Sequence, residues 1–334
     1  MPRSKKSRID ENALGEARDY AAKMNSSSLL VWDDGAIVAE DYFDTNQTDT
    51  LLPSKSLSKP IASIAVGRAI ALGYITDLDQ SVADFILEWR GTDKASITIR
   101  DVLLMQTGLL EQSFELDPMG PLMRAYIDPY HEQYIIEQYP LTDAPATRYS
   151  YSNATGDLVA IIIERATGKP YENFLGEEIL APIGAAGGEA WLNRPSGKAH
   201  SGCCMFFMAE TYLKLARLLL DQGAVDGEQI LPAGFVQQMR QPSKFNQHYG
   251  LGVWLGYPYS EDRGFLGPDS PIPGIFHSQP YLAEDVYLFD GSGSQVIYIV
   301  PSANIIVMRT GNNPTGEEKW DNSFLINTIL SGME

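Results

Sequence analysis

The strand-forming segments of this chain lie at its two ends, and helix-forming segments fill the region between them. Near the N-terminus, two apolar runs flank Asp33-Asp34-Gly35, a turn sequence typical of a β-hairpin. Because strands need partners to bury their apolar faces, we expect one antiparallel sheet built from both ends of the chain. The predicted strands are 29–32, 36–43, 249–255, 287–289, 295–300 and 305–309.

The middle of the chain has mainly helical periodicity. We therefore predict an α+β fold and a single domain over residues 1–334. In this division, residues 1–60 and 245–334 form a sheet lobe, and residues 61–244 form an inserted, mainly helical lobe. The predicted helices are 13–24, 56–73, 99–105, 153–167, 171–180, 210–222, 232–240 and 320–330, and a long loop is predicted at 257–281.

Charge and terminal sequence restrict the partners. The formal net charge of −18 would repel nucleic acid and anionic membranes, so we expect neither as a partner. The first eight residues are basic but no apolar core follows them, and no run approaches transmembrane length. We expect a cytoplasmic protein without a secretory signal, and a homodimer stays open as its assembly.

Cysteine and histidine usage favours neither a disulfide framework nor a metal site. Cys203 and Cys204 are adjacent, so we expect them not to bridge each other. The histidines are scattered along the sequence, and we expect no metal-ligand cluster and no cofactor. They are His131, His200, His248 and His277.

Ser56-Leu57-Ser58-Lys59 stands at the head of an apolar helix and is the sole Ser-x-x-Lys in the sequence. Residues i and i+3 share one helix face, so the Ser56 hydroxyl and the Lys59 amine would lie close together. This arrangement gives a hydroxyl nucleophile a nearby base. The alternative is a helix start with serine as the cap and lysine as a surface charge.

Tyr151-Ser152-Asn153 is a second motif, placed between an extended segment and a helix. A tyrosine near Lys59 could pass protons between nucleophile and leaving group. Asn153 could donate to a substrate carbonyl or hold the lysine. The alternative for Tyr151 is a buried aromatic with a satisfied hydroxyl. A second Tyr-x-Asn, Tyr171-Glu172-Asn173, begins an ordinary amphipathic helix and is interpreted as structural.

The third motif is the glycine-rich segment Asp290–Gln295, which leads into a predicted strand. Small residues at a strand edge let a substrate approach the backbone closely. The alternative is a simple glycine-rich turn.

In this order, the three motifs resemble those of the serine β-lactamase-like superfamily, in the branch of class C β-lactamases, family VIII esterases and 6-aminohexanoate-dimer hydrolases. The resemblance covers nearly the whole chain and implies the fold of β-lactamases and penicillin-binding proteins. It implies that Ser56 is the nucleophile, Lys59 its base and Tyr151 the proton shuttle. The oxyanion hole would be formed by the backbone N–H groups of Ser56 and Ser294. Further stretches that carry the resemblance are 103–109, 149–157, 201–205, 215–223, 249–252 and 295–301.

The third motif departs from the family pattern, which is Lys-Thr-Gly in penicillin-recognising members and often His-x-Gly in esterases. Its equivalent here is Gly291-Ser292-Gly293 or Ser292-Gly293-Ser294, without a cation at the first position. Arg309-Thr310-Gly311 looks similar but ends the next strand, so we interpret it as unrelated. The missing cation favours hydrolysis of an ester or a linear amide over β-lactamase or D,D-peptidase activity.

Acyl transfer to another acceptor and an inactive binding module with the same fold remain alternatives. The expected partner is a small-molecule ester or amide. Its predicted contacts are Asn153, Ser292, Gly293, Trp254, Tyr130 and His277.

Overall fold

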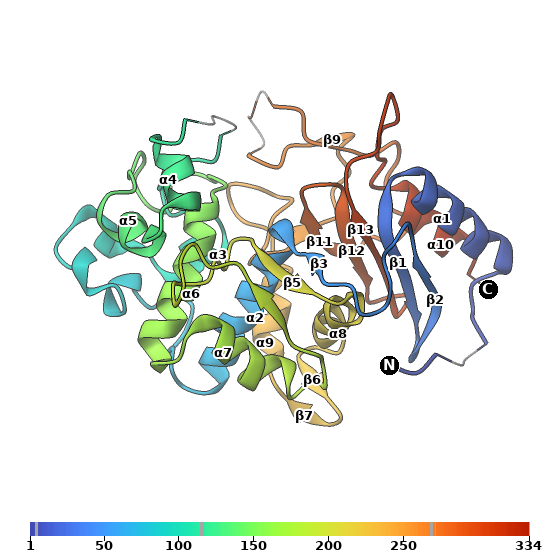
Figure 1. The fold of residues 1–334 in the computed structure, drawn as a ribbon, viewed down its shortest axis with the longest axis horizontal. Helices are drawn as coiled ribbons and strands as arrows, with labels where there is room; N and C mark the ends of the chain where they lie inside the picture. Colours follow the sequence, from blue (N-terminus) through green and yellow to red (C-terminus); the bar gives the residue numbers. More distant parts are fainter. Residues whose placement is uncertain (4–5, 114–116, 268–269, 271, 334) are drawn as a thin grey trace.

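A computed structural model describes residues 1–3, 6–113, 117–267, 270 and 272–333. Its main feature is a six-stranded antiparallel sheet in the order β2-β1-β13-β12-β11-β8. Strands from both ends of the chain therefore pair with each other, which confirms the predicted α+β fold (Figure 1). The strands are β1 Ser26–Asp33, β2 Ala36–Tyr42, β8 Trp254–Leu255, β11 Tyr287–Gly291, β12 Gln295–Val300 and β13 Ile305–Gly311.

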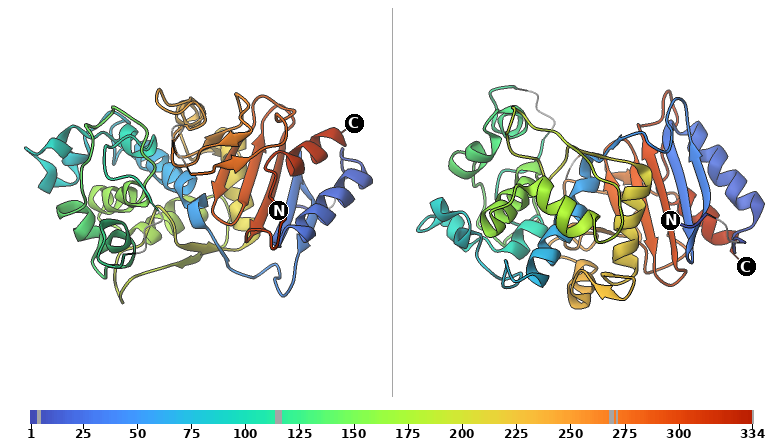
Figure 2. Two further views of the ribbon diagram at one scale, coloured as in Figure 1. Left: turned by 90° about the horizontal axis from the view of Figure 1, so that it is seen from above. Right: turned by 60° about the horizontal axis from the view of Figure 1, so that its bottom comes forward.

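Helices cover both faces of this sheet. The terminal helices α1 and α10 pack together on one face, and α8 lies on the other against β1, β12 and β13. Helices α3 to α7 gather on the side of α2 that faces away from the six-stranded sheet (Figure 2). Among them, α6 contacts α2, α3, α4, α5 and α7. Thus α8 lies on the sheet although its sequence falls within the predicted helical lobe, and the lobe boundaries stay a prediction. The helices are α1 Glu11–Lys23, α2 Ser58–Ala71, α3 Ile99–Leu103, α4 Pro121–Ile127, α5 His131–Glu137, α6 Asn153–Thr167, α7 Tyr171–Leu175, α8 Ala209–Leu220, α9 Ala233–Met239 and α10 Phe324–Ser331.

Short strands interrupt the helical middle and were not predicted. They form a three-stranded sheet β3-β5-β4 and the hairpin β6–β7. The long loop predicted at 257–281 contains the short pair β9–β10, and part of it lies outside the described residues. The bounds are β3 Leu52–Pro53, β4 Gly188–Ala190, β5 Met205–Phe207, β6 Ala224–Val225, β7 Glu228–Gln229, β9 Asp262–Arg263 and β10 Ile275–Phe276.

The strand predicted at 249–255 is mostly irregular, and only its last two residues form β8. Two glycines explain the difference. Gly252 has φ +75°, and a Cβ there would collide with the Ser63 hydroxyl on α2. A Cβ at Gly250 would collide with the backbone of Met239 on α9. Close packing against two helices therefore replaces a regular strand here.

Strand β12 explains why its sequence is apolar without alternation. Ile297 and Ile299 face the core shared with α2 and α8, whereas Val296, Tyr298 and Val300 face the core under α1 and α10. A strand covered on both faces has no solvent side, so every position favours an apolar residue.

Arg309, on β13, is a buried structural cation. Its guanidinium donates to the carbonyls of Gly293 at 2.6 Å and Ser294 at 2.9 Å, in the turn between β11 and β12. Burial lowers the pKa of Arg309 to about 10. Arg309-Thr310-Gly311 therefore braces the turn of the third motif, in keeping with the view that it is no Lys-Thr-Gly equivalent. Its further acceptors are Ser26, Met24, Asn25 and Asn312.

We predict that Arg309→Leu lowers the free energy of unfolding by at least about 3 kcal/mol, because it leaves several buried carbonyls without a donor. Urea denaturation measures the change. The control is Arg18→Leu, which removes an exposed ion pair with Asp41 and should cost no more than about 1 kcal/mol. Equal losses in the two variants would contradict the bracing role.

Candidate active site

The first two sequence motifs meet at the N-terminal end of α2. Ser56 lies in a 3₁₀ turn, Lys55–Leu57, that runs directly into the helix, and Lys59 follows one turn later. The Ser56 hydroxyl oxygen is 3.3 Å from the Lys59 amine and accepts a hydrogen bond of 2.8 Å from the Tyr151 hydroxyl. The predicted trio therefore lies within direct contact.

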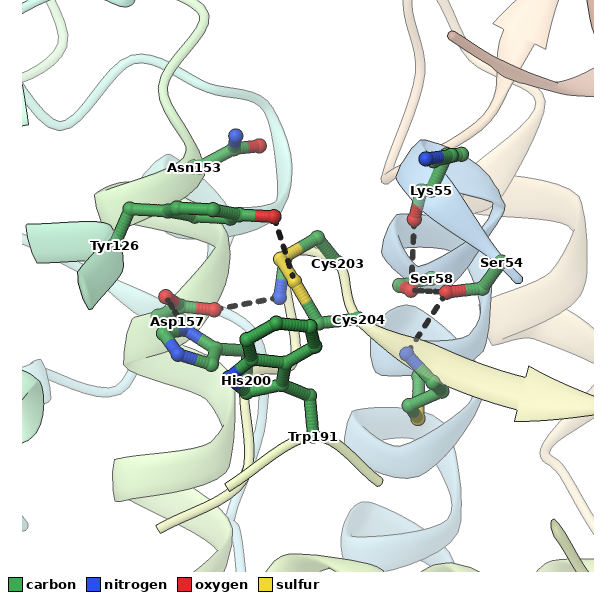
Figure 3. Close-up of a disulfide and its surroundings, with 12 residues drawn as sticks. Ser54, Lys55, Ser58, Tyr126, Asn153, Asp157, Trp191, His200, Cys203 and Cys204 are labelled. Atoms are coloured by element: carbon green, nitrogen blue, oxygen red, sulfur yellow. Dashed lines mark hydrogen bonds and ion pairs between the residues drawn. A yellow bond between two sulfur atoms is a disulfide. The ribbon is translucent and has the colours of Figure 1, made fainter. Parts of the chain in front are cut away.

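Serine hydroxyls hold the turn that carries Ser56. Ser58 donates to the Lys55 carbonyl at 2.9 Å, and the Ser54 and Ser58 hydroxyls lie 2.6 Å apart. Ser54 is also paired with Met205 of β5, through its N–H at 2.7 Å and its hydroxyl at 3.0 Å (Figure 3). Lys55 has φ +49°, so the chain turns sharply just before Ser56.

Lys59 is buried, with 4% of its surface exposed. Its amine donates to the side-chain oxygen of Asn153 at 2.7 Å and to the backbone carbonyl of Gly202 at 2.9 Å. It also lies 4.5 Å from the centroid of the Tyr151 ring. Asn153 therefore contacts the lysine, which is one of the two roles considered from its sequence.

Tyr151 is held by other aromatic rings. Trp254 stacks against it with ring centroids 6.4 Å apart, and Phe265 meets it edge-on at 5.8 Å. Trp254 is itself buried against Tyr249. The structure thus packs Trp254 against the rings of both Tyr151 and Tyr249.

The third motif approaches Ser56 at Gly291, the last residue of β11. A Cβ on Gly291 would lie 3.2 Å from the backbone nitrogen of Ser56. Ser292 is exposed, and Gly293 packs against the carbonyl of Gly311. The Ser294 hydroxyl donates to Asn313 at 3.2 Å, on the β13 side of the turn. The structure therefore brings Gly291 against the backbone of Ser56.

The other two predicted substrate contacts, Tyr130 and His277, have other partners in the structure. Tyr130 is exposed at the start of α5, with the Arg194 guanidinium 4.4 Å from its ring centroid. His277 is buried, its ring nitrogens bonded to the Ile275 carbonyl at 2.9 Å and the Tyr281 hydroxyl at 3.0 Å. Burial lowers the pKa of His277 to about 3, so it is neutral. Both side chains serve contacts of their own.

Cys203 and Cys204 form a disulfide with each other, so the prediction that they would not bridge was wrong. The physical reason lies in the backbone, since Cys204 has φ +71° in a loop pinned on both sides. The disulfide follows Gly202 directly, and the Tyr126 hydroxyl points at the Cys204 sulfur from 3.6 Å (Figure 3).

Two of the histidines come together, which corrects the expectation that they are scattered. His131 and His200 stack with ring centroids 3.8 Å apart, and with Asp157 they form a buried cluster whose ligand-type atoms lie within 4.8 Å of one another. Because the two rings are stacked and within 19° of parallel, an ion in the plane of one ring would lie well outside the plane of the other, which disfavours coordination by both rings. We therefore interpret the cluster as a hydrogen-bond network.

The charges in this cluster are set by Asp157. The ring nitrogen Nδ1 of His200 lies 2.7 Å from Oδ2 of Asp157. Burial lowers the pKa of His200, but Asp157 raises it by more, and the result is a raised pKa. Burial and the neighbouring His200 lower the pKa of His131 to about 4. Asp157 thus favours a proton on His200 over one on His131.

Two participants were missed from the sequence. Gly202 contributes a backbone carbonyl, and every residue has one, so the residue type gives no signal of this role. Gln112 pairs its N–H with the Tyr151 carbonyl at 2.7 Å, and its side chain accepts from the Asn153 N–H at 3.3 Å. The one available signal was the family-like stretch 201–205, which contains Gly202.

We predict that the denatured, unreduced protein reacts with no equivalent of a thiol reagent, and that reduction exposes two thiols, because both cysteines are in the disulfide. Thiol titration in denaturant, with intact mass before and after reduction, measures this. Two reactive thiols without reduction would contradict the bridge.

A family model described as Beta-lactamase matches residues 14–326. A Mycobacterium tuberculosis protein, Rv1367c, is 22% identical over 273 residues, which cover 66% of this chain and 66% of that protein. The chain thus spans just under two thirds of the length of this relative. No helix among the described residues is long and apolar enough to cross a membrane.

Two solved structures illustrate the likeness in fold. One, from Bacillus anthracis and assigned as a 6-aminohexanoate-dimer hydrolase, has a TM-score of 0.71 at 18% identity, with 100% of this chain and 85% of that chain covered. The other, a family VIII carboxylesterase, has a TM-score of 0.69 at 17% identity, with 97% and 98% covered.

Proposed function

The chain belongs to the Beta-lactamase family, whose members are typically serine hydrolases, and we propose that it cleaves a carboxylic ester or a linear amide through an acyl-enzyme on Ser56. One observation carries the proposal. The Ser56 hydroxyl oxygen is contacted by the Lys59 amine at 3.3 Å and by the Tyr151 hydroxyl at 2.8 Å. A simple helix cap has no need of either contact.

A count of the hydrogen-bond donors and acceptors around Lys59 supports its role as the general base. A neutral amine has two N–H donors and one lone pair. Asn153 and Gly202 offer two oxygens that can only accept, at 2.7 and 2.9 Å. If the two N–H groups bond to these oxygens, the lone pair is left for the Ser56 hydroxyl. The surroundings thus support Lys59 as the general base.

In the proposed acylation, Ser56 Oγ forms a bond to the carbonyl carbon and its proton passes to Lys59. The negative charge that develops on the carbonyl oxygen is held by backbone N–H groups, each worth about 3 kcal/mol. One is that of Ser56. Because Gly291 lies closest to it, we assign the second to Ser292, which follows Gly291, in place of Ser294.

Tyr151 then completes the cycle. Its hydroxyl passes a proton to the departing alcohol or amine as the carbonyl–leaving-group bond breaks. Tyr151 next accepts a proton from water, whose oxygen attacks the acyl carbon. As the bond between that carbon and Ser56 Oγ breaks and the acid leaves, Lys59 returns its proton to Ser56 Oγ. Packing of Trp254 on the Tyr151 ring supports this role, because it restricts the ring whose hydroxyl bonds to Ser56.

The third motif supports the choice of substrate class. Where penicillin-recognising members carry a lysine, this chain has Gly291 or Ser292. The adjacent Asp290 is paired with Arg263. Esters and linear amides need no cation at this point. The alternatives are β-lactamase or D,D-peptidase activity, acyl transfer, and an inactive binding module.

We predict that a panel of a short-chain p-nitrophenyl ester, a chromogenic cephalosporin and a linear aminohexanoate dimer separates these alternatives. The wild type should hydrolyse the ester or the linear amide and leave the cephalosporin nearly intact. Ser56→Ala should lose this activity, since no nucleophile remains. Full activity in Ser56→Ala would contradict the mechanism, and cephalosporin turnover above that of the ester would contradict the substrate class.

We predict that Tyr151→Phe lowers kcat by about 10²- to 10⁴-fold, because it removes the proton shuttle and keeps the ring packed on Trp254. The matched control is Tyr249→Phe, since the buried Tyr249 hydroxyl has no hydrogen-bond partner among the described residues and its ring packs on the same Trp254. Steady-state kinetics should show a wild-type kcat for this control. An active Tyr151→Phe enzyme would exclude the shuttle role.

A further inference from the structure

We propose that Asp157 is a positioning residue for Lys59, acting through the backbone of Gly202. The inference rests on the proposed function, since it assigns how the general base is held. Asp157 is 2% exposed and does not contact Ser56 or Lys59 by hydrogen bond in the described structure. Its influence must therefore pass through an intermediate group.

A continuous set of hydrogen bonds provides the connection. Oδ2 of Asp157 faces Nδ1 of His200 at 2.7 Å, and Oδ1 accepts the Gly202 N–H at 2.8 Å. The carbonyl of the same Gly202 accepts the Lys59 amine at 2.9 Å. Asp157 thus fixes the residue whose carbonyl binds the lysine (Figure 3 shows Asp157, His200 and the disulfide that follows).

Two glycines allow the loop to reach the helix closely enough for this. A Cβ on Gly156 of α6 would lie 2.8 Å from the Cα of Gly202. A Cβ on Gly202 would lie 2.7 Å from the Asn153 carbonyl oxygen. Ser201 adds a clamp, because its hydroxyl donates to the Gly156 carbonyl at 2.7 Å and accepts the Ala160 N–H at 2.8 Å.

Because Asp157 also lies on α6, this one helix holds the lysine through two residues. Asn153 and Asp157 are four residues apart and share a face of the helix. Asn153 binds the amine directly, and Asp157 binds it through Gly202. Burying a carboxylate is unfavourable unless it is paired, and His200 supplies the pairing.

Loss of this anchor should act on the chemical step. With the Gly202 carbonyl displaced, one N–H of Lys59 loses its acceptor and the lone pair is no longer confined toward Ser56. Substrate binding is unaffected, because Asp157 does not reach the substrate. The signature of positioning is therefore a lower kcat with an unchanged KM.

The test compares Asp157→Leu with Asp157→Asn under steady-state kinetics on the best substrate of the panel. Asp157→Leu should lower kcat by about 10- to 100-fold, as expected for a displaced catalytic group. Asp157→Asn should keep kcat within about threefold, because its amide can still accept from Gly202 and donate to a neutral His200. Asp33→Leu, which removes a buried carboxylate of β1 that pairs with Arg8, is the matched control and should keep the wild-type kcat.

A wild-type kcat in Asp157→Leu, a change confined to KM, or equal impairment of Asp157→Asn and Asp157→Leu would each overturn the inference. If Asp157→Leu does not fold, Ser201→Ala releases the same loop and should lower kcat at unchanged KM. An unchanged kcat in Ser201→Ala would then overturn the inference. A fluorophosphonate probe that labels the wild type but not Ser56→Ala tests the proposed function separately. Labelling at Ser56 with unaffected Asp157 variants would refute the inference alone.

Discussion

The buried amine of Lys59 is the contact on which the active-site arrangement depends. It joins α2 to α6 through Asn153 and to the loop before β5 through Gly202. A buried amine is costly without acceptors, so these two oxygens must be held in place wherever the amine is to stay. The Gly156–Gly202 approach and the Asp157 anchor follow from this requirement.

The sheet supplies the other half of the site. The end of β11 comes to the backbone of Ser56 at Gly291, and β5 holds the preceding turn through Ser54. Arg309 reaches from β13 to brace the turn that follows Gly291. Ser56 thus lies where helical and sheet segments meet, and neither part alone would define its position.

The sequence predicted the features that local pattern and motif chemistry determine. Helix α6 and strand β12 were located with their observed ends, because α6 stops at Gly168 with φ +72° and β12 is an unbroken apolar run. Ser56, Lys59 and Tyr151 were expected together, and the structure brings them into contact. The Beta-lactamase fold was expected from the order of the three motifs.

What the sequence could not supply depends on tertiary packing. The Gly202 carbonyl has no side-chain signature. His131 and His200 are 69 positions apart and meet only after α5 and the 198–205 loop pack on α6. Trp254 was expected to contact the substrate, and its packing on the Tyr151 ring follows from the irregular backbone at Gly250 and Gly252, which the sequence did not predict. The proposed assignment of the second oxyanion donor depends on the course of the glycine-rich turn after Gly291, which its composition does not encode.

The most direct test of the account is to trap the covalent intermediate. Rapid acid quench of the wild type during turnover of an ester, followed by peptide mapping with mass spectrometry, locates the acyl group. The account predicts an acyl adduct on the peptide that contains Ser56, at the Ser56 hydroxyl. An adduct on another residue, or steady turnover by a variant in which Ser56 is replaced, would contradict it.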